Sequence, residues 1–143
     1  MTETTPSTDL LSQATRQRLQ EVRRGLLHLH KALLEVERRS YERLHGRVGS
    51  GNEMLQLVIQ HPWFAWLRSV SELVVQIDET LDGGVEEPVT ERDAQALLQQ
   101  VRSLLKPSES GEDFGRRYYR TLQEDPDSVL AHAAVTRLLP PAA

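Results

Sequence analysis

Residues 61–79 read HPWFAWLRSVSELVVQIDE, and this stretch sets the expected architecture. It holds both tryptophans of the chain, and Pro62 stands where a helix can begin, because a first-turn residue needs no amide hydrogen bond. Apolar residues then recur every three or four positions, which is the spacing of one buried helix face. They are Trp63, Trp66, Leu67, Val70, Leu73, Val74, Ile77 and Leu81. We therefore expect a helix, broken or restarted at Pro62, that ends near Leu81.

A longer apolar stripe precedes this segment. Leucine and valine alternate at spacings of three and four from Leu19 to Val36, so the first helix is expected to run from a cap at Asp9 or Ser12 to about Leu44. At 1.5 Å per residue such a helix is about 50 Å long, which exceeds its expected partners. It is therefore expected to overhang them or to bend, and Gly25 is a place where bending or close helix approach is cheap.

Shorter amphipathic segments make up the rest of the chain. We expect helices over residues 53–60, 90–105, 112–124 and 126–139. Asn52 is the expected cap of the first, Thr90 with Asp93 resembles a capping box, and Asp125 before a proline is a good helix start. Apolar residues surround most of the last helix, so we expect it to be largely buried.

The composition favours a single all-helical domain. The chain has 143 residues, of which 38% are hydrophobic and 27% charged, and this length is enough to bury a core. Valine is the only β-branched aliphatic residue in quantity, so a sheet has little material. The predicted fold is all-α, an up-and-down bundle of four to five helices with a long N-terminal helix. Residues 1–8 are expected to be a disordered tail, 9–139 the bundle, and 140–143 a C-terminal tail.

The sequence also restricts the setting and the partners. It contains no cysteine, which excludes disulfides, thiolate metal sites and cysteine nucleophiles. Its polar start lacks a basic region followed by an apolar one, and no apolar run approaches the ~20 residues of a membrane span. We therefore expect a soluble, cytoplasmic protein with no membrane partner. The net charge of −4 is mild, and the basic side chains of the first helix form no single stripe, so a nucleic-acid partner is not expected.

Four polar residues are predicted to face the core. On a helical wheel at about 100° per residue, His30 and Glu37 fall inside the apolar stripe of the first helix. Asp78 shares one edge of the next stripe with Ser71, and His132 lies beside apolar residues of the last helix. Because buried charges need partners, these four either meet in a metal or proton-transfer site or form separate structural networks. The seven-residue spacing of His30 and Glu37 is not a ligand spacing, which favours the networks.

Other residues are candidates for contact with a partner. Trp63, Phe64 and Trp66 are expected to be core aromatics. Phe64 falls off the apolar stripe and Arg68 falls on the solvent side, so the alternative is that both, with Tyr119, are available to a protein or a second copy. Arg116 to Arg120 read RRYYR, which suits a phosphate or single-stranded nucleic acid. The alternative, a solvated helix face with Tyr118 buried, is favoured.

One resemblance adds to these observations. Residues 62–68 (PWFAWLR), continuing through Ser71 to Asp78 and Glu79, resemble a segment of small uncharacterised bacterial all-helical proteins, and residues 125–132 (DPDSVLAH) belong to the same pattern. The resemblance covers about a quarter of the chain. It implies a bacterial cytoplasmic setting and no particular chemistry.

The sequence favours a function without catalysis. It has no phosphate-binding glycine loop, no Gly-x-Ser-x-Gly turn and no His-Glu-x-x-His, and its one Glu-x-x-His spacing, Glu42 to His45, lies at a helix end on the solvent side. We expect a protein-interaction or regulatory module, with a homodimer through the overhang of the first helix as one form, and we predict no cofactor. The alternative is a bundle that binds a transition metal or a small ligand through His30, Glu37, Asp78 and His132.

Overall fold

A computed structural model describes residues 10–83, 88–110 and 113–141 and confirms the all-α bundle. Its elements are α1 (Gln13–His45), α2 (Gly51–Gln60), the 3₁₀-helix η2 (Pro62–Leu67), α3 (Arg68–Leu81), α4 (Glu91–Leu104), α5 (Asp113–Glu124) and α6 (Pro126–Thr136). No strand occurs in these ranges, where Leu10 and Thr90 form one isolated bridge. The expected tail over residues 1–8 lies outside the described residues.

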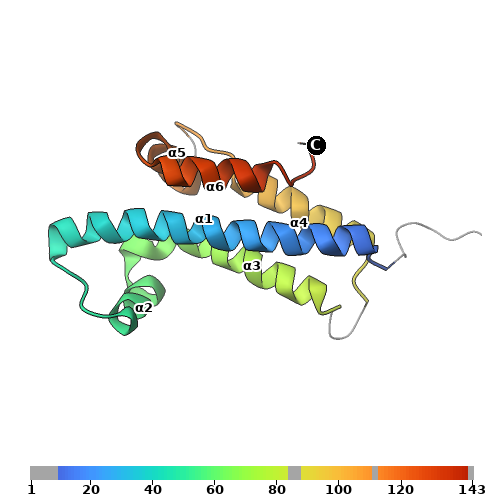
Figure 1. The fold of residues 1–143 in the computed structure, drawn as a ribbon, viewed down its shortest axis with the longest axis horizontal. Helices are drawn as coiled ribbons and strands as arrows, with labels where there is room; N and C mark the ends of the chain where they lie inside the picture. Colours follow the sequence, from blue (N-terminus) through green and yellow to red (C-terminus); the bar gives the residue numbers. More distant parts are fainter. Residues whose placement is uncertain (1–9, 84–87, 111–112, 142–143) are drawn as a thin grey trace, which may run out of the picture.

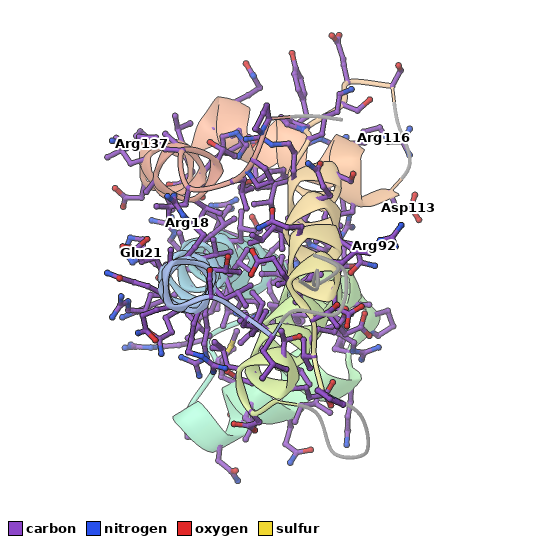
Figure 2. All side chains as sticks on the ribbon, turned by 90° about the vertical axis from the view of Figure 1, so that its right-hand side faces the viewer. Arg18, Glu21, Arg92, Asp113, Arg116 and Arg137 are labelled. Atoms are coloured by element: carbon purple, nitrogen blue, oxygen red, sulfur yellow. The ribbon has the colours of Figure 1, made fainter. Side chains whose placement is uncertain are left out.

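The long helix α1 is the centre of the molecule (Figure 1). It packs against α6 on one side, α3 and η2 on the other, and α4 along its N-terminal half. Seen end-on, α4 fills the space between α5 and α3 beside α1 (Figure 2). The core side chains of α1 are all fully buried, and they are Leu19, Val22, Leu26, Leu29 and Leu33. No helix in the described ranges combines the length and the hydrophobicity that crossing a bilayer requires.

Local capping chemistry sets most of the helix boundaries. The amide of Thr15 donates to Ser12 Oγ at 3.0 Å, which starts α1 as expected. Thr90 and Asp93 form the predicted capping box of α4, and Asp125 accepts from the amide of Ser128 at 3.0 Å to start α6. The expected cap at Asn52 is wrong: Ser50 Oγ accepts from the amide of Glu53 at 3.1 Å, so α2 begins earlier.

The end of α1 overhangs the bundle. Its last turns extend beyond α3, α5 and α6, and only the loop to α2 continues from there (Figure 1). Leu44, which the helical wheel places on the buried stripe, is 70% exposed, whereas Tyr41 and His45 at the same end meet Trp63 of η2. The burial of Leu44 that the helical wheel predicted is therefore wrong.

A close crossing joins α1 to α6. A Cβ atom on Gly25 would lie 2.5 Å from Val135 Cγ2, so only glycine allows the two helices to approach this closely. The prediction that Gly25 permits close approach of helices is consistent with this contact.

The segment after α6 is held against α4. The guanidinium of Arg102 donates to the carbonyl oxygens of Thr136, Leu139 and Pro140, and Gln99 Nε2 donates to the carbonyl of Pro141 at 3.0 Å. These contacts fix residues 136–141 to α4.

The expectation that α6 is largely buried is wrong. Ser128, Ala131 and Val135 face the core, whereas Val129 and Leu130 are 43% and 69% exposed and Ala133 and Ala134 are exposed as well. The apolar residues around α6 indicated burial on all sides, but this helix lies on the outside of the bundle, where it packs against α1 and α5 (Figure 1).

Candidate functional site

The four polar residues predicted to form a site have separate partners. His30 Nε2 lies 3.2 Å from Ser71 Oγ, and Arg23 Nε donates to Asp78 Oδ1 at 2.5 Å. Glu37 lies farther along α1, where α5 and η2 meet it. Thus Asp78, His30 and Glu37 lie at three different positions along the axis of α1.

The helical wheel explains why they looked like one group. Residues 23, 30 and 37 share one direction on α1, but each step of seven residues rises about 10 Å along the axis. A wheel removes that distance, because it projects the helix onto a plane. In the described part of the chain, no three His, Asp or Glu residues are grouped so that they could hold a metal ion. The sequence left open whether His30, Glu37, Asp78 and His132 meet in one site or form separate networks, and in the described part of the chain they have separate surroundings, as the favoured networks would require.

Burial affects both core-facing histidines. It lowers the pKa of His30 and of His132, because a charged imidazole loses hydration when it leaves water. Their ordinary pKa is near 6.5, so both are neutral in the folded protein at neutral pH. A neutral imidazole keeps one ring nitrogen as an acceptor, which suits the partner that His132 has.

That partner is Tyr118. Its side chain is fully buried, and its hydroxyl lies 2.6 Å from His132 Nδ1. Burial raises the pKa of Tyr118 well above its usual value, so the phenol stays protonated and forms a hydrogen bond with the neutral imidazole ring. The sequence prediction that Tyr118 is the buried residue of the RRYYR segment is confirmed.

Replacing Tyr118 by phenylalanine is expected to lower the free energy of unfolding by about 1–3 kcal/mol, because His132 Nδ1 would keep its burial and lose its donor. Urea denaturation followed by circular dichroism at neutral pH measures the loss. Tyr119→Phe is the matched control: this half-buried neighbour makes no side-chain hydrogen bond to the described residues, so a change within about 0.5 kcal/mol is expected. Equal effects of the two substitutions would contradict the Tyr118–His132 interaction.

A hollow next to Glu37 is the richest candidate for a binding site. It has a volume of about 570 Å³ and lies between the C-terminal half of α1, η2 and α5. Ten residues line it: Val36, Glu37, Ser40, Arg43, Leu44, Trp63, Arg117, Arg120, Thr121 and Glu124. It thus combines a partly apolar wall with three guanidinium groups and two carboxyl groups.

Glu37 is the electrostatically perturbed group of this hollow. Burial raises its pKa; the indole N–H of Trp66 and the charge of Arg117 act in the opposite direction, and Glu124 adds to the increase. The interaction of Trp66 with Glu37 is loose, because neither Trp66 Nε1 nor Trp63 Nε1 has a hydrogen-bond partner of normal geometry in the described residues, although both atoms are buried. The prediction that Glu37 faces the interior is confirmed to this extent: it is half-buried.

The three residues predicted to contact a partner differ in their environments. Phe64 is fully buried, as expected of a core aromatic, so the alternative that it is exposed to a partner is wrong; in η2 the amide of Phe64 donates to the carbonyl of His61, and the 3₁₀ turn directs the ring inward. Arg68 is exposed and donates to the carbonyl of Ile59, which fixes α2 to α3. Tyr119 is half-buried.

Sequence reasoning missed the aromatic cluster around Tyr41. Its ring stacks on His45 at 4.5 Å between centroids and meets His61 and Trp63 edge-on at 5.3 and 5.9 Å. His61 also accepts from the amide of Trp63 at 3.1 Å, so it caps the start of η2. The spacing of Tyr41 and His45, one helical turn, was the available signal, but His45 was placed on the solvent side.

Comparison with known proteins gave no match, whether to family models, to curated proteins or to solved structures, so the functional argument depends on the geometry of this chain.

Proposed function

We propose that this protein is a non-enzymatic helical module that acts through protein contacts made by the outer face of α6. We define the α6 face as Val129, Leu130, Ala133 and Ala134. The observation that carries the proposal is that this face is apolar and exposed, with Leu130 at 69%. The resemblance of residues 62–79 and 125–132 supports a bacterial, cytoplasmic setting for the module.

The α6 face is unusual for a surface helix. A helix of a soluble domain commonly has charged residues opposite its core side, whereas one that is apolar all round is normally buried. Ser128, Ala131 and Val135 already cover the core side of α6, so the α6 face adds nothing to the packing of the monomer. Contiguous exposed apolar surface of this kind marks a contact site in soluble proteins.

A second copy of the chain fits this face. In an antiparallel pair of α6 helices related by a twofold axis near residue 132, Leu130 lies opposite Ala134, so that a large side chain meets a small one. The same pairing places Asp127, in the first turn, opposite Arg137 at the other end, so both charges are matched across the axis. Arg137 projects outward beside α6 in Figure 2. A homodimer through α6 is therefore the form of contact that we propose.

The overhang of α1 is the weaker surface for this contact. Leu44 is exposed there, but its sequence neighbours Arg43 and His45 are polar and exposed. The overhang of α1 offers a single exposed leucine, whereas the α6 face offers four neighbouring apolar residues.

A charged substitution in the α6 face is expected to abolish dimerisation. A single helix pair is smaller than a standard interface, so we expect a dissociation constant on the order of micromolar. Multi-angle light scattering over a series from micromolar to millimolar protein should show a monomer–dimer equilibrium. Leu130→Glu should leave a monomer at all concentrations, because a carboxylate would be placed in the seam. Val75→Glu is the matched control, since Val75 is 54% exposed on α3, across α1 from α6.

Charge reversal tests the antiparallel register. Asp127→Arg or Arg137→Asp alone should weaken the dimer, and the two together should restore it, because the paired charges are exchanged. Circular dichroism checks that each variant keeps its helices. A wild-type protein that stays monomeric at every concentration, or a Leu130→Glu variant that dimerises as the wild type does, would contradict the proposal.

Small-ligand binding is the second candidate function. The observation that favours it is the hollow at Glu37, whose three arginines form no ion pair with the described residues. The transition-metal form of this candidate has less support, because its four residues have separate partners.

A further inference from the structure

The hollow beside Glu37 has the size of a small-molecule site. Its volume of about 570 Å³ lies within the range of roughly 300–1,000 Å³ that is typical of ligand pockets. A comparable hollow of about 560 Å³ between α3 and α4 is lined by a single charged residue, Glu72, and so offers nothing to orient a charged ligand. The hollow beside Glu37 is built by residues from the C-terminal half of α1, from η2 and from α5, so it exists only when these three elements are packed together.

Its charges favour an anion. Arg43, Arg117 and Arg120 line the hollow with Glu37 and Glu124, which leaves one net positive charge when both carboxyl groups are ionised. No arginine–carboxylate ion pair forms among these five side chains. A guanidinium presents a planar fork of donors that matches a carboxylate or a phosphate. Three such groups without an anionic partner leave room for one to be supplied from solution.

The three arginines differ in how firmly their guanidinium groups are held by neighbouring residues. Arg117 donates to the carbonyl of Trp63 at 3.4 Å, and its guanidinium lies 5.9 Å from the ring centre of Trp66, so it is already oriented. Arg43 donates to Ser40 Oγ at 3.0 Å. Arg120 makes no hydrogen bond to the described side chains or carbonyls, so its guanidinium is the one whose donors are free for a ligand.

The remaining wall suits an apolar body. Val36 and Leu44 on α1 and the ring of Trp63 line the hollow, and Leu44 is otherwise exposed to water. The buried indole N–H groups of Trp63 and Trp66 have no acceptor among the described residues, so their positive ends add to the local potential. An amphipathic anion would cover Leu44 and place its charge among the arginines.

We propose that the hollow between α1, η2 and α5 binds a small organic anion, whose carboxylate or phosphate is held by Arg117 and Arg120 and whose apolar body lies against Trp63 and Leu44. This inference deepens the small-ligand candidate and is independent of the α6 face. A failure of dimerisation and a failure of ligand binding are therefore separate results, because light scattering reports the first and ligand titration the second.

Two probes distinguish the anionic group. Phenyl phosphate and benzoate share an apolar ring, and inorganic phosphate has none. Each is titrated into the protein while tryptophan fluorescence is followed, since both tryptophans of the chain lie at or next to the hollow, and isothermal calorimetry checks the result. We expect saturable binding of at least one aromatic anion, at least tenfold tighter than that of inorganic phosphate. Benzyl alcohol, which has the ring without the charge, should not bind.

Arginine variants test the assignment of the residues. Arg120→Gln should weaken binding at least tenfold, because it removes a charge-assisted contact. Arg116→Gln is the matched control, with the same charge change on the same helix; Arg116 is exposed, does not line the hollow and projects from the outer side of α5 (Figure 2). It should bind as the wild type does. Equal weakening by both variants would show that general positive charge attracts the anion and would overturn the proposal.

Glu37 supplies a pH test. The groups that face it are Arg43 on its own helix and Arg117, Arg120 and Glu124 on α5, while η2 contributes the two uncharged indoles. Because burial raises the pKa of Glu37, it gains a proton before an exposed glutamate does as the pH falls, and the hollow becomes more positive. Glu37→Gln should therefore bind phenyl phosphate more tightly than the wild type at pH 7.5, and the difference should disappear as the pH falls through the raised pKa of Glu37, where the wild type loses the same charge.

Three outcomes would overturn the proposal. The first is no saturable binding of either aromatic anion in fluorescence and calorimetry. The second is that Glu37→Gln weakens binding at pH 7.5 while its fold is intact by circular dichroism. The third is tighter binding of a single-stranded oligonucleotide that Arg116→Gln and Arg120→Gln weaken alike, which would make the whole RRYYR segment a nucleic-acid surface.

Discussion

Replacing Phe64 by alanine is expected to lower the free energy of unfolding by about 3–5 kcal/mol, because a large buried ring would be removed. The ring is fully buried, lies 5.6 Å from the ring of Tyr41 between centroids, and belongs to the short 3₁₀-helix that joins α2 to α3. Truncation would leave a cavity at this junction, where the aromatic cluster and α1 meet. Urea denaturation followed by circular dichroism gives the value.

Leu44→Ala is the informative comparison for Phe64. A helical wheel places Leu44 on the buried stripe and Phe64 off it, whereas the structure reverses the two, with Leu44 at 70% exposure and Phe64 at 0%. We therefore expect Leu44→Ala to change the free energy of unfolding by less than about 0.5 kcal/mol. A large effect of Leu44→Ala together with a small effect of Phe64→Ala would mean that η2 is not a 3₁₀-helix in solution.

Substitution of Gly25 by alanine is expected to destabilise the protein although alanine is the better helix former. The gain in helix propensity is about 1 kcal/mol, but the new methyl group would lie 2.5 Å from Val135 Cγ2, and overpacking typically costs about 1–3 kcal/mol. A valine in a helix has one strongly preferred rotamer, so Val135 cannot turn away cheaply. Either α6 moves outward or α1 bends.

A double substitution tests this contact directly. Val135→Ala removes the clashing atom, and the atoms that remain near the new Cβ lie at 3.6 and 3.7 Å, which is ordinary van der Waals contact. We expect Gly25→Ala with Val135→Ala to cost less than the sum of the two single substitutions, because the methyl group on α1 fills the space vacated on α6. Strict additivity in urea denaturation would show that the helices are farther apart in solution than in the structure.

The fold was predictable from the sequence where local signals act within one helix. The stripe from Leu19 to Leu33, the cap at Ser12 and the capping box at Thr90 each depend on residues a few positions apart. Phe64 was misplaced because the wheel assumes 3.6 residues per turn, whereas a 3₁₀-helix has three. In that geometry Phe64 and Leu67 share one direction, and both are fully buried.

The site was predictable only in part, for a geometric reason. A wheel reports the direction of His30 and Glu37 and omits the distance along the axis, so it could not show that Ser71 and Trp66 would be their separate neighbours. The RRYYR segment was noted for its cations, but α5 contributes Arg117 and Arg120 to a hollow whose other side is Arg43 and Trp63. Such an assembly depends on tertiary packing, which one sequence does not encode as a pattern.

The close crossing of Gly25 and Val135 has a consequence for how the chain reaches its native state. The two residues lie far apart in the sequence, so α1 can complete its packing only after α6 has been synthesised. During synthesis α1 and α3 can already pair as an antiparallel hairpin, held by contacts such as Arg23 with Asp78, while the leucine-rich side intended for α6 stays open to solvent. Synthesis of α6 is therefore the step after which this side of α1 can be covered.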